Sequence, residues 1–440
     1  MSLATPDKIR TLQRKLYVKA KAEPDFRFYL LYDKVWREDI LAHAYAQAKA
    51  NGGAAGVDGV TFSQIEAKGE SEWLAGLREE LRTKSYRPQP VRRVMIPKPG
   101  GGERPLGIPT LRDRVVQTAV KLVIEPIFEA DLEASAYGYR PNRSATDAIR
   151  EVHRLLRQGY TEVVDADLSR YFDTIPHASL MRCVARRIVD RHILWLIKMW
   201  LRAPVEERDG NGKPRLSGGK SSTRGTPQGG VISPLLANLY MNRLLKHWRI
   251  SGQTERLQGH IIAYADDFVV LSRGKAAEAL AWIRDVTARL DLALNENKTS
   301  VRNALRERFD FLGYAFGPHW DRRTGQRYLG ASPAKKSVQR IKDKIGTTVE
   351  FAKVEPWPEV RDRLNRLLLG WSAYFSYGTR AAAYRAIDDH VYDRVRHFLA
   401  RRHKSASRGT RAFSAHVVYG GLGVLRLRGR YRAAPACARA

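Results

Sequence analysis

Cysteine is almost absent from this sequence of 440 residues, which contains only Cys183 and Cys437. The two cysteines lie far apart and form no Cys-x-x-Cys or Cys/His spacing. A disulfide framework needs several cysteines, and a structural zinc site needs closely spaced ligands. The composition therefore argues against both a small disulfide-stabilised protein and a structural zinc domain.

Long apolar runs are also missing. No stretch approaches the roughly 18 apolar residues that a membrane-spanning helix requires. The basic segment Met1 to Lys21 contains no apolar stretch before a small-residue cleavage site, as a secretory signal would. We therefore expect neither membrane association nor secretion, and we expect the bacterial cytoplasm or nucleoid as the location.

Acidic residues are few relative to basic ones: 46 aspartates and glutamates stand against 77 lysines and arginines, a formal net charge of +31. The nucleic-acid backbone is the commonest polyanion that such a charge matches. A basic membrane-surface protein is the competing interpretation, but it needs an amphipathic or spanning segment. Residues 401–440 hold ten basic and no acidic side chains. This predicts a tail that lies on phosphates or is disordered without them, and the sequence leaves its order open.

The most informative stretch is Gly259 to Arg273, in which two apolar runs flank the residues Tyr-Ala-Asp-Asp at 264–267. This pattern predicts two short strands joined by a tight turn. Burial and mutual repulsion both oppose two adjacent carboxylates, so something positive should lie beside Asp266 and Asp267. A magnesium ion with oxygen ligands suits this role. For an isolated Asp-Asp pair an ordinary hairpin turn is the simpler interpretation, but the rest of the chain favours the metal site.

A second acidic strand is predicted at Val163 to Ile175. Its β-branched start is followed by Asp165 and Asp167, which would share one face of a strand. Only one of them need join Asp266 at a metal ion, and Asp167 is favoured because it ends the strand where a cleft would open. Phe172 follows Asp167 by five residues.

Two further segments, one before the acidic strands and one between them, carry residues that could bind a substrate. Residues 91–109 predict a β-hairpin, with Lys98 beside its glycine turn and Arg104 just past it; such cations could reach a triphosphate, although a solvated basic hairpin is nearly as good an interpretation. Residues 225–240 combine glycines that permit close backbone approach with Ser233-Pro234, which suits a helix start. A plain loop-to-helix junction would explain those glycines equally well.

The remaining pattern is mainly helical. A turn at Leu294 to Thr299 carries Lys298, and Phe309 to Tyr314 predicts an aromatic strand. From Ser332 onward helices dominate, and the length of the chain predicts two or three domains. Helices are expected at residues 6–21, 35–50, 112–133 with a kink at Pro126, from about 144, and at 276–290, and a hairpin is expected at 204–224.

Together these stretches resemble the reverse transcriptases encoded by group II introns. Residues 163–175 are similar to their first catalytic strand, residues 225–238 to their template and nucleotide loop, and residues 264–267 to their Tyr-Ala-Asp-Asp signature. The ordered matches extend over roughly residues 5 to 400, and five further segments match in the same order: 56–62, 96–109, 137–144, 294–299 and 309–314.

The resemblance implies an α+β fold: a right-hand polymerase with fingers and an antiparallel-sheet palm, followed by an all-helical thumb that doubles as the maturase domain. The expected divisions are a helical N-terminal extension over 1–56, fingers and palm over 57–330, thumb and maturase over 331–402, and a basic tail over 403–440.

The resemblance also implies the catalytic groups. Asp167 and Asp266 would bridge two Mg²⁺ ions, for which Mn²⁺ could substitute, and Asp267 would support them more weakly. Such a pair of ions stabilises the attacking and leaving oxygens of nucleotidyl transfer. Lys298 is the candidate general acid for the leaving pyrophosphate, although a solvated lysine is an equally good interpretation.

Four further residues are implied to bind the incoming deoxynucleotide. Lys98 and Arg104 would hold its phosphates, and Gln228 would touch the nucleotide or the template. Phe172 would occupy the space of a ribose 2′ hydroxyl, although a simple core aromatic is the alternative.

The expected function is synthesis of DNA on intron RNA, with help to intron splicing and mobility. The implied partners are the intron RNA template, a DNA or RNA primer, deoxynucleotides and target DNA; the oligomeric state stays open. Three alternatives remain: a reverse transcriptase of a retron, diversity-generating, defence or repair system, an RNA-dependent RNA polymerase, and a splicing-only maturase. Because the sequence ends without the paired-cysteine endonuclease of many relatives, no intrinsic DNA cleavage is expected.

Overall fold

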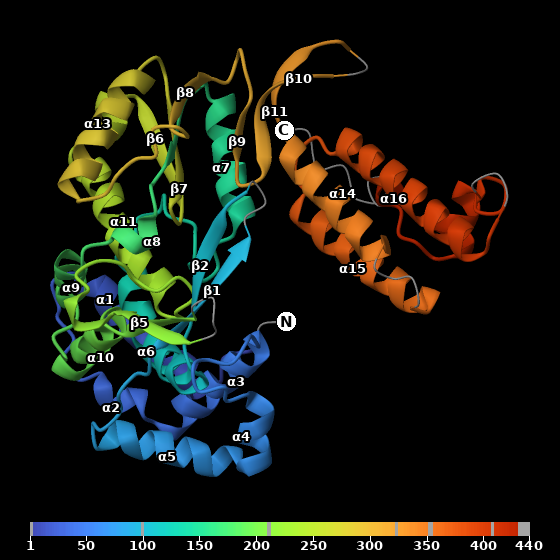
Figure 1. Ribbon diagram of the computed structural model, residues 1–440. Coiled ribbons are helices and arrows are strands. Elements are labelled where there is room, and N and C mark those ends of the chain that lie inside the picture. Colours follow the sequence, from blue (N-terminus) through green and yellow to red (C-terminus); the bar gives the residue numbers. More distant parts are fainter. Residues whose placement is uncertain are drawn as a thin grey trace. The chain divides into compact units, whose positions relative to one another are not determined.

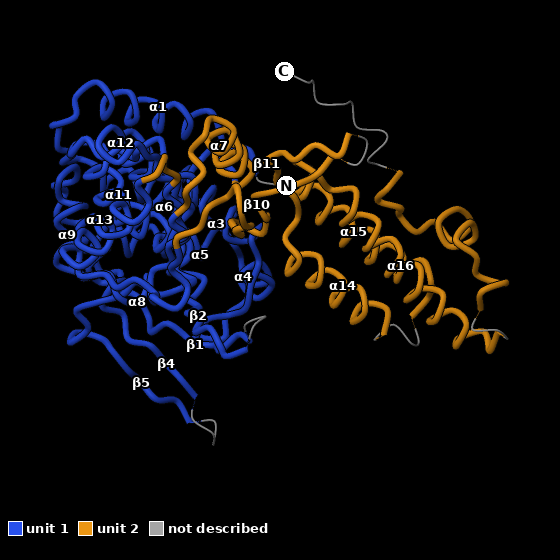
Figure 2. Tube along the Cα trace, turned by 90° about the horizontal axis from the view of Figure 1, so that it is seen from above, with its two compact units in different colours: residues 1–144, 164–270, 275–300 blue, residues 145–163, 271–274, 301–440 orange. Residues whose placement is uncertain are grey.

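The computed structural model describes residues 3–97, 101–208, 213–321, 324–350, 355–405 and 409–429. The chain divides into two compact units, of which unit 1 comprises residues 1–144, 164–270 and 275–300 and unit 2 comprises residues 145–163, 271–274 and 301–440 (Figure 2). Both units mix helices and strands, so the mixed α and β class predicted from the sequence is confirmed. No helix within the described ranges is long and apolar enough to cross a membrane.

Unit 1 begins with five helices, of which the first three pack on its central helix α6 (Leu111–Glu129) (Figure 1). The two helices predicted in the first 50 residues correspond to α1 and α3, which both pack on α6. Arg187 fixes the end of α1, because its buried guanidinium donates to the carbonyls of Ala20 and Glu23. The five helices are α1 (Asp7–Ala22), α2 (Tyr32–Val35), α3 (Glu38–Asn51), α4 (Phe62–Lys68) and α5 (Glu70–Arg82).

Helix α6 (Leu111–Glu129) forms the middle of the unit 1 core. Thr110 caps its first turn by accepting a hydrogen bond from the Asp113 amide. The helix contains Pro126 and ends at Glu129, four residues before the predicted end. The early end has a physical cause: the Arg140 guanidinium binds the carbonyls of Glu133 and Ala136 and pairs with Glu129, which holds the following residues as a loop.

A four-stranded sheet in unit 1 contains both hairpins expected from the turn residues. Its order is β2-β1-β4-β5, with antiparallel hairpins β1/β2 and β4/β5 joined by a parallel pairing of β1 with β4. The two closing turns lie outside the described residues. The strands are β1 (Val91–Pro97), β2 (Glu103–Ile108), β4 (Pro204–Arg208) and β5 (Pro214–Gly218).

A second four-stranded sheet carries the acidic motifs and has the order β6-β7-β3-β8. The predicted Asp-Asp hairpin is formed by β6 (Gly259–Tyr264) and β7 (Asp267–Ser272), and the predicted acidic strand is β3 (Glu162–Asp167). The loop after the glycines leads into α11 (Ser233–Ile250), which begins with Pro234 in its first turn as predicted. The remaining elements here are β8 (Ser300–Asn303), α8 (Tyr171–Thr174), α9 (His177–Ala185), α10 (Arg191–Leu201), the 3₁₀ turn η1 (Gly219–Ser221), α12 (Gln253–Arg256) and α13 (Ala276–Arg289).

Unit 2 contains α7 (Ala145–Arg157) and an antiparallel sheet of order β11-β10-β9. The prediction of a single strand over Phe309 to Tyr314 is wrong. The chain reverses at Leu312-Gly313, where both residues have positive φ, so β9 (Phe309–Phe311) pairs back onto β10 (Tyr314–Trp320). The sequence analysis missed a tight turn inside an aromatic run. The third strand is β11 (Arg327–Pro333).

The rest of unit 2 is a helical bundle in which α14 packs on both α15 and α16 (Figure 1). Val418, Val424 and Leu427 are buried in the same apolar core, so the described part of the basic C-terminal stretch packs on the bundle. Asp388 of α16 fixes this stretch: its carboxylate is 2% exposed and accepts the amides of Leu427 (2.9 Å) and Arg428 (3.1 Å). The helices are α14 (Lys335–Glu350), α15 (Trp357–Tyr374), α16 (Ala381–Arg402) and the π-helical turn η3 (Val417–Gly421).

Replacing Asp388 by alanine should destabilise unit 2 by about 2–4 kcal/mol, because two backbone donors lose their buried acceptor. Urea denaturation of the full chain measures this loss. Asp393→Ala is the matched control on the same helix: Asp393 is exposed and pairs with Arg396 on the surface, so its removal should cost less than about 1 kcal/mol. Equal losses in the two variants would contradict the anchoring role of Asp388.

Candidate active site

The turn between β6 and β7 positions two of the predicted carboxylates. Ala265 and Asp266 form a two-residue connection in which Ala265 has φ +60°, a conformation that glycine usually supplies in such turns. The segment at residues 135–137 holds this strained backbone in place. The Ala263 amide donates to the Ser135 carbonyl (2.9 Å), and the Tyr137 amide donates to the Ala263 carbonyl (2.8 Å).

Gly138 lies against the same turn. A Cβ atom at this position would collide with the backbone nitrogen of Ala265 and come within 2.9 Å of the Tyr264 carbonyl carbon. The buried Asn238 of α11 donates from Nδ2 to the Gly138 carbonyl at 2.6 Å. The acidic turn therefore packs against the segment that contains Gly138, and position 138 has no room for a side chain.

Asp167 at the end of β3 has two side-chain donors. The ammonium of Lys298 lies 2.9 Å and the amide nitrogen of Asn295 lies 3.2 Å from its Oδ2 atom. The backbone supports this arrangement, because the Asn295 amide donates to the Asp167 carbonyl and the Lys298 amide to the Asn295 carbonyl. The turn at 294–299 thus brings the predicted lysine to the predicted acid.

The carboxylates of β3 and the turn oppose the ionisation of Asp266 and Asp267. Burial, followed by the charges of Asp165, Asp266 and Asp167, raises the pKa of Asp267 to about 7, against which Lys298 acts weakly. Burial raises the pKa of Asp266 as well; Asp167 adds to this, while Arg104 and Lys298 lower it. A concentration of negative charge this strong is a candidate site for a cation.

The residues present suit a divalent cation that is shared with a substrate. Within the described ranges, no group of three or more His, Cys, Asp or Glu side chains is arranged to hold a metal ion alone. Magnesium, however, commonly takes one or two protein carboxylates and completes its shell with water and substrate phosphates. The purely oxygen donor set of Asp167, Asp266 and Asp267 fits that ion.

Strand β2 meets the glycine loop directly. The Arg104 guanidinium donates to Gln228 Oε1 at 2.8 Å, and the Gly107 amide donates to the Gln228 carbonyl. A Cβ atom at Gly229 would collide with the Gly107 carbonyl oxygen, so this crossing requires glycine. The hairpin cation and the loop glutamine predicted from the sequence therefore lie together.

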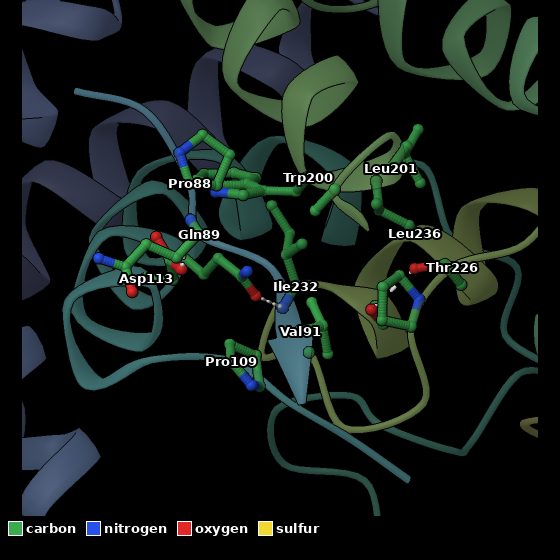
Figure 3. Close-up of a pocket in the computed structure, with 15 residues that line it drawn as sticks. Pro88, Gln89, Val91, Pro109, Asp113, Trp200, Leu201, Thr226, Ile232 and Leu236 are labelled. Carbon is green, nitrogen blue, oxygen red and sulfur yellow. Dashed lines mark hydrogen bonds between the residues drawn. The ribbon is translucent and has the colours of Figure 1, made fainter. Parts of the chain in front are cut away.

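A narrow pocket lies behind the same loop, where Thr226 and Ile232 face Val91, Pro109 and the buried Asp113 (Figure 3). Asp113 accepts hydrogen bonds from the Tyr86 hydroxyl (2.6 Å) and the Thr110 hydroxyl (2.8 Å). None of the acidic candidates lines this pocket, so it is separate from the acidic turn.

Phe172 is 5% exposed and lies beside Tyr139, with ring centroids 6.4 Å apart in an edge-on arrangement. Tyr139, Asn295 and Asp165 were not among the site residues predicted from the sequence. Tyr139 could have been found through its membership of the 137–144 motif. Asp165 was recognised as sharing a strand face with Asp167, but Asp167 was preferred because it ends the strand. Lys98 lies outside the described residues.

Two protein-family profiles match this chain. The profile described as "Reverse transcriptase (RNA-dependent DNA polymerase)" matches residues 96–316, and "Group II intron, maturase-specific domain" matches residues 338–414. The first match contains both acidic strands, the glycine loop and the Lys298 turn.

Two curated relatives have related sequences. Protein YkfC of Escherichia coli K12 is 34% identical over 367 residues, which cover 75% of this chain and 93% of the relative. Group II intron-encoded protein LtrA of Lactococcus lactis subsp. cremoris is 29% identical over 350 residues, which cover 65% of this chain and 56% of the relative. The aligned part thus spans about half the length of LtrA.

Asp267→Asn should stabilise the metal-free protein in a pH-dependent way. Unfolded aspartate titrates near 4, whereas the pKa of Asp267 in the folded state is about 7. Between these values the folded state holds a proton that the unfolded state has lost, so the carboxyl costs stability as pH rises to about 7. The Tm advantage of the variant should therefore grow from about pH 4 to about pH 7 and stay constant above.

Thermal unfolding in EDTA across this pH range measures the effect. Asp291→Asn is the control, because Asp291 is exposed and pairs with Arg224 on the surface. An advantage of Asp267→Asn that does not change with pH would show that the charge of Asp267 carries no penalty.

Proposed function

Because the chain belongs to the group II intron reverse transcriptases and is an RNA-directed DNA polymerase, we propose that it copies intron RNA into DNA at Asp167, Asp266 and Asp267. One observation carries this assignment: the ends of two separate acidic strands meet, and burial and mutual repulsion raise the pKa of the carboxyls in the turn. Such repulsion is tolerated where a ligand offsets it.

Reverse transcriptases work with divalent metal ions, and here Asp167 and Asp266 would hold two Mg²⁺ ions with Asp267 in support. The ions supply positive charge at the attacking and leaving oxygens. The protein fixes the positions of these carboxylates. The 135–138 segment holds the turn that carries Asp266, and Asn295 orients the Asp167 carboxylate by a hydrogen bond.

The other site residues receive proposed roles in binding the deoxynucleotide. Arg104 is proposed to hold phosphates, and its hydrogen bond to Gln228 links that contact to the loop that would meet the base pair. The buried ring of Phe172 is proposed to exclude a 2′ hydroxyl, since an ordered aromatic side chain leaves no room to accommodate an added oxygen. Lys98 is proposed as a second phosphate ligand from its motif alone.

Lys298 is proposed as the proton donor to the leaving pyrophosphate. Its ammonium lies 2.9 Å from Asp167, within reach of the site, and it is 66% exposed, so it can move. A lysine at such a site acts both as a charge and as an acid.

We further propose the domain roles of a right-hand polymerase: an N-terminal extension over 1–56, fingers and palm over 57–330, a helical thumb and maturase over 331–402, and a basic C-terminal stretch over 403–440. The thumb and maturase proposal is supported by the profile match at 338–414 and by the bundle of α14, α15 and α16. Exposed basic residues on α14 and α16 suit contact with intron RNA, which would assist splicing and mobility. They include Lys335, Lys336, Arg340, Lys344, Arg385, Arg394, Arg401 and Arg402.

Asp266→Ala should reduce primer extension on an RNA template by about 10³-fold or more, because the site loses a charge that acts in the transition state. Binding of structured RNA should be retained, since the maturase region is unchanged. Extension with magnesium and deoxynucleotides, run beside an RNA-binding titration, separates the two activities. Asp291→Ala is the surface control. Extension by a folded Asp266→Ala enzyme would overturn the catalytic assignment.

Phe172→Ala should increase incorporation of ribonucleotides relative to deoxynucleotides by about 10-fold or more, because the added oxygen gains space. Competing single-nucleotide incorporation on one primer measures this ratio, and Phe172→Tyr, which keeps the ring, should retain the wild-type preference. If Phe172→Ala lowers stability without changing the sugar preference, the Phe172 ring contributes to the hydrophobic core and not to sugar selection.

A further inference from the structure

Tyr139 has an unusual environment for a large aromatic residue. Its side chain is 44% exposed although it stands beside the acidic turn, and its ring meets the Phe172 ring edge-on at 79°. A ring that served only the core would be expected to be buried more completely. Its exposed surface is therefore available for contact with a ligand.

The Tyr139 side chain lies near charged groups of both signs. Burial, followed by the charge of Asp266, raises the pKa of Tyr139, and the charge of Arg104 lowers it. A phenol hydroxyl is protonated at neutral pH in any case, so it can donate a hydrogen bond. Within the described residues, this hydroxyl has no hydrogen-bond acceptor.

The backbone holds Tyr139 in a fixed position. Its φ of +55° lies in the left-handed region, which a bulky residue adopts only when its surroundings enforce it. The preceding Gly138 is pressed against Ala265 and bound by Asn238, so Tyr139 is tied to the same turn that carries Asp266. A strained residue locked to a catalytic turn is preorganised for contact with a ligand.

We propose that Tyr139 binds the incoming deoxynucleoside triphosphate: its ring closes with Phe172 around the ribose, and its hydroxyl donates a hydrogen bond to a phosphate oxygen. A neutral hydroxyl suits this position. It would add affinity for the triphosphate and would not repel the cations that the carboxylates are proposed to hold. The proposal rests on the proposed polymerase function and makes Tyr139 both a substrate-binding and a sugar-positioning residue.

Single-nucleotide incorporation by the full chain on a primed RNA template tests this proposal. Tyr139→Phe removes only the hydroxyl, and Tyr139→Ala also removes the ring. The measured quantities are the apparent Kd for the deoxynucleotide, the maximal incorporation rate, and the preference for deoxynucleotides over ribonucleotides. Tyr29→Phe, at a tyrosine that is 63% exposed and outside the site, is the matched control.

Tyr139→Phe should raise the apparent Kd for the deoxynucleotide about 3- to 10-fold at an unchanged maximal rate, as loss of one hydrogen bond predicts. Tyr139→Ala should also weaken the preference for deoxynucleotides, because Phe172 loses the ring that packs against it. Affinity for the primer–template should stay at the wild-type value in both variants.

The proposal fails if Tyr139→Phe matches wild type, or if Tyr139→Ala changes only thermal stability or only the maximal rate. Failure of the polymerase function itself looks different, because the wild-type protein would then extend no primer. A wild-type protein that extends primers, together with a silent Tyr139→Phe, would overturn the tyrosine contact alone.

Discussion

The mutual repulsion of carboxylates at two strand ends is the constraint around which unit 1 is arranged. Burial, followed by the charges of Asp165, Asp266 and Asp167, raises the pKa of Asp267 to about 7. Lys298 lowers the pKa of both Asp266 and Asp267, and Arg104 lowers that of Asp266. Such an arrangement costs stability in an empty site and would become favourable with the proposed cations and polyphosphate bound, so the proposed affinity for substrate and the instability without it would have the same origin.

Close backbone contacts bring the parts of the site together. Gly138 meets the acidic turn and Gly229 meets Gly107, and at each crossing a Cβ atom would collide with main chain. Through these contacts the hairpin that carries Arg104 meets the loop that carries Gln228, and the segment at Gly138 meets the turn that carries Asp266. The site is therefore built from main chain as much as from functional side chains, which explains why glycines recur in its loops.

Much of the fold could be predicted from local patterns. A glycine turn predicted the hairpin of β1 with β2, and two apolar runs predicted that of β6 with β7. Apolar spacing predicted α6, and Ser233-Pro234 predicted the start of α11. The failures arose where tertiary contacts overrode the pattern. Arg140 ends α6 early by binding carbonyls of the next loop, and the reversal at Leu312-Gly313 divides a run of aromatic residues that reads as a single strand.

The sequence by itself determined the chemistry: a basic, cysteine-poor chain with two acidic strands, a glycine loop and cationic hairpins in the order of a known polymerase family. Only the tertiary structure decided which groups meet, because Lys298 reaches Asp167 across 131 positions of sequence and Arg104 reaches Gln228 across 124. It also revealed Tyr139, an exposed residue with positive φ that directly follows Gly138, which packs on the turn at Ala265. Local propensity carries no information about such contacts, since they form only when distant segments share one core.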